Sequence, residues 1–204
     1  MAKVKVKRRG TRIDMTAMCD VAFLLLTFFI MTSTAKLPEP YEVSMPASTV
    51  QSKVPDTNLA TIAVEENRVY FGVTGREVRK DMLSRMAEKY KMSFTEEEIE
   101  RFSLIDFFGV DISQVKSLIA MSNTDRMRTG AQHGIPHDSI NNQLSDWVLS
   151  ARYAAAKIDK MDLNIAIKGD ASIDYPVIKR VIDILQDQKK NSFYLITSLR
   201  SDDF

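Results

Sequence analysis

An aspartate stands inside a long apolar segment near the start of the sequence. The segment runs from Met15 to Thr34, and Asp20 is its only charged side chain. On translocon-type scales a charged group at the centre of a membrane costs roughly 2.5 to 3.5 kcal/mol, and such groups usually face protein or water. A low-dielectric setting also disfavours the charged form of a carboxyl group, so its ionisation can switch with proton supply. The residue and its setting therefore predict a proton carrier.

Three threonines are predicted to share one helical face with Asp20. Thr16 lies four residues before it, and Thr27 and Thr34 lie seven and fourteen residues after it. At 3.6 residues per turn these offsets return to nearly the same face, so the polar stripe should turn toward partner helices. Two structural interpretations stay open. In the first, each threonine hydroxyl forms a hydrogen bond with the backbone of its own helix one turn back. In the second, Asp20 forms an interhelical hydrogen bond that only holds a complex together.

The segment 15–34 is long enough to cross a bilayer as a single helix, because roughly 20 residues at about 1.5 Å each cover the ~30 Å hydrocarbon layer. Six basic side chains precede it, at positions 3, 5, 7, 8, 9 and 12. Basic flanks stay in the cytoplasm, which places residues 1–14 inside and the remainder in the periplasm of a bacterial inner membrane. A cleaved secretory signal is the alternative, but the length and Asp20 argue against it.

The composition excludes several classes of function. The chain carries 28 basic and 27 acidic residues, but six basic residues and one acidic residue precede the apolar segment. The part from Lys36 on carries 22 basic and 25 acidic residues, which leaves no basic surface for nucleic acid. The single cysteine, Cys19, lies within the span, so no disulfide holds the exported part together. No phosphate-binding glycine loop or nucleophile motif appears, and His133 and His137 lie in a polar loop. We expect no enzyme, no cofactor and no metal site.

The remainder of the chain predicts an α+β protein: one transmembrane helix, a linker over 35–58 that holds four of the six prolines, and a small periplasmic α/β domain over 59–204. Within that domain, residues 92–157 are predicted to be a mostly helical insertion. The predicted elements are a hairpin of 59–64 and 68–73, helices over 77–90, 95–108, 111–120, 139–158 and 175–190, a polar loop over 122–139, and strands over 163–169 and 193–199. Thr95 with Glu98 predicts a capping box, and Asp174 is the predicted cap of the last helix. The last strand, helix and strand make a βαβ unit with parallel strands.

The sequence resembles the ExbD/TolR family of inner-membrane proton-channel subunits. The run "IDMTAMCDVAFLLLTFFIMTS" matches the family's aspartate motif at Ile13, Thr16, Met18, Asp20 and Val21. The run "KGDASIDYPVIKRVIDIL" matches its last strand-to-helix turn at Asp170, Tyr175, Val181 and Asp183, and "VSMPAS" around Pro46 resembles a segment that follows the linker. Asp14, Ala17 and the long middle of the chain depart from the family pattern.

The resemblance implies a homodimer of this subunit inside a pentameric ring of a polytopic ExbB-like protein. Proton flow past Asp20 would drive movement passed to a TonB-like transmitter, and so energise transport across the outer membrane. A TolR-like role in envelope integrity is one alternative. Another is a membrane-anchored periplasmic binding module with no proton role, in which the helix is only a tether. A third is a hydrolase exported behind a cleaved signal.

Overall fold

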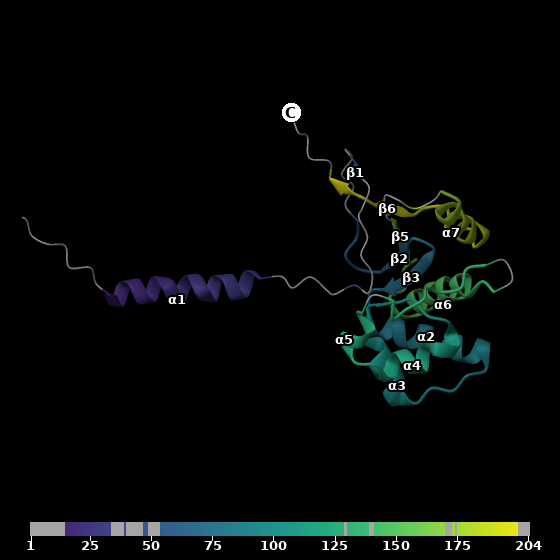
Figure 1. Ribbon diagram of the computed structural model, residues 1–204, viewed down its shortest axis with the longest axis horizontal. Coiled ribbons are helices and arrows are strands. Elements are labelled where there is room, and N and C mark those ends of the chain that lie inside the picture. Colours follow the sequence, from purple (N-terminus) through teal and green to yellow (C-terminus); the bar gives the residue numbers. More distant parts are fainter. Residues whose placement is uncertain are drawn as a thin grey trace, which may run out of the picture. The chain divides into compact units, whose positions relative to one another are not determined.

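The computed structural model describes residues 15–33, 39, 47–48, 54–128, 130–138, 141–169, 173 and 175–199. The chain divides into two compact units, Met1–Leu37 and Pro38–Phe204. The second unit is here called the body. The first contains one helix, α1 (Met15–Thr32), and the second contains all the strands (Figure 1). The predicted span therefore forms as a helix, while its last residue, Thr34, lies outside the described residues.

A five-stranded mixed sheet forms the centre of the second unit. The strand order is β4-β3-β2-β5-β6, and β5 runs parallel to both of its neighbours while the other pairs are antiparallel. The bounds are Leu59–Glu65 for β2, Arg68–Val73 for β3, Phe107–Phe108 for β4, Asn164–Gly169 for β5 and Tyr194–Ile196 for β6. The α+β class, the hairpin and the parallel βαβ unit are confirmed.

The hairpin consists of two antiparallel strands, β2 and β3, joined by a tight turn. Glu65 pairs with Arg68, so only Glu66 and Asn67 lie between the strands, and Glu66 adopts a left-handed backbone with φ 51°. The apolar, β-branched and aromatic residues of the hairpin suit a pleated, half-buried surface. Register then sets which face each side chain joins.

The helices that pack on this sheet lie close to the ranges predicted from the spacing of apolar residues. Val78, Met82, Leu83 and Met86 form the buried side of the first body helix, as their spacing indicates. The helices of the second unit are α2 (Arg76–Tyr90), α3 (Glu96–Ser103), the 3-10 turn η1 (Ile112–Gln114), α4 (Val115–Ala120), α5 (Asn123–Arg126), α6 (Gln143–Ile158) and α7 (Tyr175–Asp187).

The helices predicted over 95–108 and 139–158 have different bounds in the structure. The helix that begins after Thr95 has its predicted capping box, in which the Thr95 hydroxyl accepts from the Glu98 N–H, but it ends at Ser103 instead of Phe108. Phe108 lies in β4 opposite Phe71, where tertiary packing outweighs the helical pattern. Similarly, α6 begins four residues later than predicted, because the Asn142 side chain accepts from the Ser145 N–H at 3.1 Å and caps it there.

The C-terminal elements differ from prediction in length and number. Helix α7 ends at Asp187, three residues early, and its predicted cap Asp174 lies outside the described residues. The predicted last strand is two strands, β6 and β7 (Ser198–Leu199), and β7 pairs in parallel with β1 (Ala47–Ser48). The predicted loop over 122–139 contains the short helix α5, which Ser122 caps.

An aromatic cluster forms the centre of the core on the helical side of the sheet. The rings of Phe108 and Trp147 meet edge to face with centroids 4.7 Å apart, and Phe102 lies 5.2 Å from Phe108. All three side chains are buried. They come from the segment 92–157, so the residues predicted to be an insertion supply the middle of the core of the whole body.

The fold predicts a large effect of truncating this cluster. Phe108→Ala should lower the free energy of unfolding by about 3 to 5 kcal/mol, because it removes a buried ring and leaves a cavity. Denaturant unfolding of the full chain in detergent, followed by fluorescence of the single tryptophan, measures this change. The control is Leu104→Ala, since Leu104 is 54% exposed and should change stability by less than about 0.5 kcal/mol. Equal effects of the two variants would contradict the assigned core.

A carboxylate between α2 and α6 makes stability depend on pH. Asp81 accepts hydrogen bonds from Arg85 Nε at 2.6 Å and from Lys157 Nζ, on α6, at 2.5 Å. Burial raises the pKa of Asp81, but these two cationic donors outweigh it and hold the pKa below its ordinary value. The unfolded chain therefore binds this proton first as the pH falls.

The stabilising contribution of Asp81 is fully present above its unfolded pKa and is lost as the pH falls through its folded pKa. Asp81→Asn should make the free energy of unfolding decline less steeply between about pH 5 and pH 2. Chemical denaturation at several pH values measures the slope. Glu97→Gln removes an exposed carboxylate from α3 and is the matched control. An unchanged slope in Asp81→Asn would refute this role.

Candidate functional site

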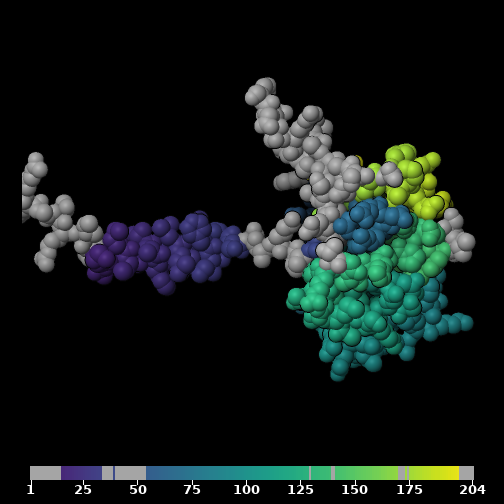
Figure 2. Space-filling view, in the orientation of Figure 1, coloured from purple at the N-terminus to yellow at the C-terminus, as the bar shows by residue number. Residues whose placement is uncertain are grey.

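Helix α1 presents its side chains to its surroundings along its whole length. It has 18 residues, or about 27 Å at 1.5 Å per residue, and none of them is classed as buried (purple in Figure 2). By length and composition it can cross a membrane. The core helix of a soluble protein would be mostly buried. An apolar helix without cover from its own chain needs lipid or partner helices around it.

The structure brings three of the four predicted site residues onto one face of this helix. Thr16, Asp20 and Thr27 all lie in the regular part of α1, so their offsets of four and seven residues place them within about 40° around the axis. Asp20 is exposed and Thr27 is half-buried. Five residues separate Asp20 from the start of the helix at Met15, which is about 7.5 Å along the axis.

The hydroxyl of Thr27 bonds to its own helix. Its Oγ1 donates to the Leu24 carbonyl oxygen at 2.9 Å, which is the structural interpretation of a membrane threonine given above. The same oxygen keeps lone pairs, so it can accept a further hydrogen bond from a protonated carboxyl group on a neighbouring helix. Thr32 makes the same kind of bond, to Phe28 at 2.8 Å, but it lies about 120° from Asp20 around the axis.

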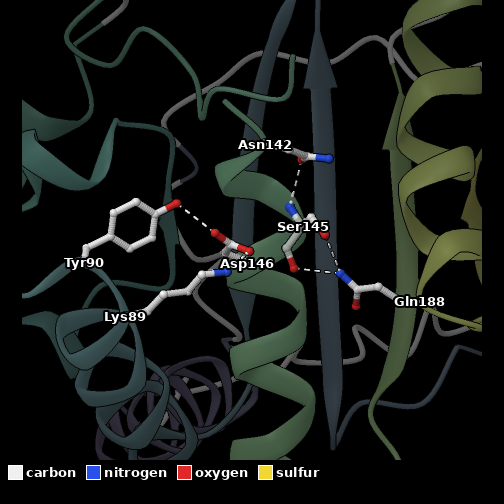
Figure 3. Close-up of polar contacts among 6 residues, drawn as sticks. All are labelled: Lys89, Tyr90, Asn142, Ser145, Asp146 and Gln188. Atoms are coloured by element: carbon white, nitrogen blue, oxygen red, sulfur yellow. Dashed lines mark hydrogen bonds and ion pairs between the residues drawn. The ribbon is translucent and has the colours of Figure 1, made fainter. Parts of the chain in front are cut away.

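A second polar cluster lies in the body, where α6 meets α2 (Figure 3). Asp146, on α6, accepts from the Tyr90 hydroxyl at 2.8 Å and forms an ion pair with Lys89. Burial raises the pKa of Tyr90, and the hydrogen bond to Asp146 raises it further. The phenol therefore stays a neutral donor. This arrangement satisfies the carboxylate fully and fixes α6 against α2.

The same cluster continues to the end of α7. Gln188 Nε2 donates to both the carbonyl oxygen and the hydroxyl of Ser145, at 2.7 and 2.8 Å (Figure 3). The Asn142 cap completes the start of α6 beside it. Each of these side chains forms a hydrogen bond or an ion pair with another group of the body, so the cluster has a structural role. Within the described ranges no three His, Cys, Asp or Glu side chains come together as a metal site.

The sequence missed the ionic contacts of the body. Arg79, on α2, donates to Asp106 at 2.7 Å, and Lys168, on β5, forms an ion pair with Glu39. Lys168 and Glu39 are 129 positions apart in the sequence, so no local pattern could have paired them. The only sequence signal was a lysine in an otherwise apolar strand, since a buried lysine is almost always paired.

A family model described as biopolymer transport protein ExbD/TolR matches residues 7–199, nearly the whole chain. Comparisons with curated proteins and with solved structures found no match. The family is transport-associated and non-enzymatic, and its members work with membrane partners in a complex. The apolar N-terminal helix and the α+β body agree with its architecture. The chain therefore belongs to the ExbD/TolR family.

Proposed function

We propose that this chain is an ExbD-like subunit of a proton channel in the bacterial inner membrane. In this role it uses the proton motive force to energise TonB-dependent transport across the outer membrane. Residues 1–14 lie in the cytoplasm, α1 spans the membrane once, and the body lies in the periplasm. The observation that carries the proposal is Asp20, the one charged group on an apolar helix that its own chain leaves uncovered.

Asp20 is proposed to take up a proton and release it toward the other side of the membrane. A neutral carboxyl group can move through or face a less polar environment than a carboxylate can. Each elementary charge that crosses gains about 2.3 kcal/mol per 100 mV of membrane potential, which is enough to bias a rearrangement of packed helices. Thr16, Thr27 and Thr34 are proposed to tune the hydrogen bonding of the carboxyl groups in the assembly, on their own helix or on a neighbouring one.

A single helix cannot enclose a proton path, so partners are part of the proposal. The polar stripe of α1 suits the interior of a larger assembly, where neighbouring helices supply hydrogen-bond partners that lipid cannot. We infer an ExbB-like polytopic protein as a pentameric ring around two copies of this chain, and a TonB-like protein that receives the movement. The TolR-like alternative has the same site and a different output, and a mere tether has no use for the stripe.

The proposal predicts that Asp20→Asn abolishes function. The amide fills the same space but cannot ionise, so energy-dependent uptake of an outer-membrane receptor substrate should fall to the level of a strain without the protein. Asp20→Glu keeps an ionisable group and should retain part of the uptake. Immunoblots of membranes provide the control for protein amount, and resistance to detergent distinguishes the TolR-like output. Normal uptake and a sound envelope in Asp20→Asn would leave only the tether interpretation.

The polar stripe gives a second prediction, with a control on the same helix. Thr27→Val removes the hydroxyl with little change of volume and should reduce uptake severalfold, because a protonated carboxyl group on a neighbouring helix loses this acceptor. Thr32→Val removes an equivalent hydroxyl that bonds only along the helix on another face. It should leave uptake unchanged, and Thr27→Ser should restore it. Equal uptake in the two valine variants would show that Thr27 has only a backbone role.

A further inference from the structure

One edge of the five-stranded sheet is paired over only part of its length. Strand β4 lies at this edge beside β3, and its two residues pair with Phe71 and Gly72. Strand β3 has six residues, so the half that begins at Arg68 runs past the end of β4. A bare stretch of strand edge presents backbone N–H and C=O groups with which a strand of another chain can pair. This half of β3 is therefore open to such pairing unless something covers it.

The loop between α5 and α6 covers this part of the edge. Residues 131–136 of the loop, all of them among the described residues, are here called the edge guard. The N–H of Ile135 donates to the carbonyl oxygen of Val69 in β3 at 2.8 Å. The N–H of Gly134 donates to the carbonyl oxygen of Gly109, directly after β4, also at 2.8 Å. The edge guard thus occupies carbonyl groups that a strand added at this edge would use.

Two buried side chains anchor the edge guard. Gln132 is only 2% exposed, and both ends of its amide are bonded. Its Oε1 accepts from the N–H of Gly109 at 2.6 Å, and its Nε2 donates to the carbonyl oxygen of Arg126 at 3.1 Å. Ile135 is also 2% exposed and belongs to the main hydrophobic core. The edge guard is therefore held by hydrogen bonds to the edge and by burial of an apolar side chain.

Gly134 lets the edge guard lie directly against β3. Its φ is +91°, and a Cβ atom there would lie 3.0 Å from Arg68 Cα and from the Val69 nitrogen. Gly130, in the same loop, has a similar φ of +83°, but a Cβ atom there would meet nothing within 4 Å. A side chain at either position strains the backbone. Only a side chain at position 134 also pushes the edge guard away from β3.

We propose that the edge guard prevents β3 from pairing with the β6 strand of a second copy of this chain. Each copy carries both partners of such a contact, because β6 ends the sheet on the side opposite to β4. Leu195, in the middle of β6, is 57% exposed. Pairing of β3 in one copy with β6 in the next is a head-to-tail contact, which can continue from copy to copy.

The edge guard consequently limits strand-to-strand association of the body. The segment was predicted to be a plain polar loop, and its contacts give it this second role. The inference does not depend on a proton role for Asp20, because every contact that carries it lies within the body.

Two substitutions in the full chain in detergent test the proposal. Gly134→Ala pushes the edge guard from β3, and Gln132→Ala removes its amide anchor. Each should speed hydrogen exchange of the Gly109 amide about tenfold, as expected for loss of a buried hydrogen bond. Each should also raise severalfold the fraction of chains that sediment as complexes larger than those of the wild type. This fraction should increase with protein concentration.

Gly130→Ala is the matched control for backbone strain. It introduces the same side chain at an equally left-handed position of the same loop, and it should leave both the exchange and the complex size unchanged. Leu83→Ala is the control for stability, since Leu83 is completely buried in α2, away from this edge. It should lower the free energy of unfolding without producing the larger complexes.

Three results would overturn the proposal. The first is wild-type complex sizes in a variant whose Gly109 amide exchanges tenfold faster, because the bare edge would then recruit no second copy. The second is wild-type exchange in both guard variants, because the described contacts would then not hold the edge guard. The third is equal association in Leu83→Ala, because larger complexes would then follow from any loss of stability. Fluorescence of the buried Trp147 shows which variants are folded.

Discussion

A carboxyl group on an apolar helix needs something other than lipid beside it, and this requirement organises the membrane half of the molecule. Lipid offers no hydrogen-bond donor and no water, so an uncovered Asp20 would be costly in every state of ionisation. No side chain of α1 is buried within its own unit, Met1–Leu37. The need for partner helices thus follows from the energetics of one residue, and the family membership of the chain supplies the class of partner.

The second unit, Pro38–Phe204, depends on a different interaction, which is nonlocal packing. Hairpin β2–β3, helix α2 and the capping box at Thr95 were predictable because each rests on neighbours within a few positions. Strand β4 was not, because its two residues read as a continuation of α3. Phe108 joins the sheet only because Phe71 and Trp147 lie beside it, and both are distant in the sequence.

The candidate site shows the same division. Helical periodicity was enough to place Thr16, Asp20 and Thr27 on one face, because a straight apolar helix leaves no other arrangement. The direction of the Thr27 hydroxyl was left open, since a threonine can donate either along its own helix or across to a neighbour. The ion pair of Lys168 with Glu39 was beyond sequence reasoning altogether, because a strand lysine gives no sign of which anion it meets.

The pairing of β1 with β7 has a mechanical consequence. Along the chain, β1 lies between the membrane helix and β2, so a pull transmitted along the chain from the membrane reaches β1 before it reaches β2. The β1–β7 ladder is two residues long, whereas β2 is paired over six positions on each of its sides. Under tension the short ladder yields first and the long ones share the load. The β1–β7 pairing can thus open and lengthen the connection to the membrane helix while the five-stranded sheet stays intact.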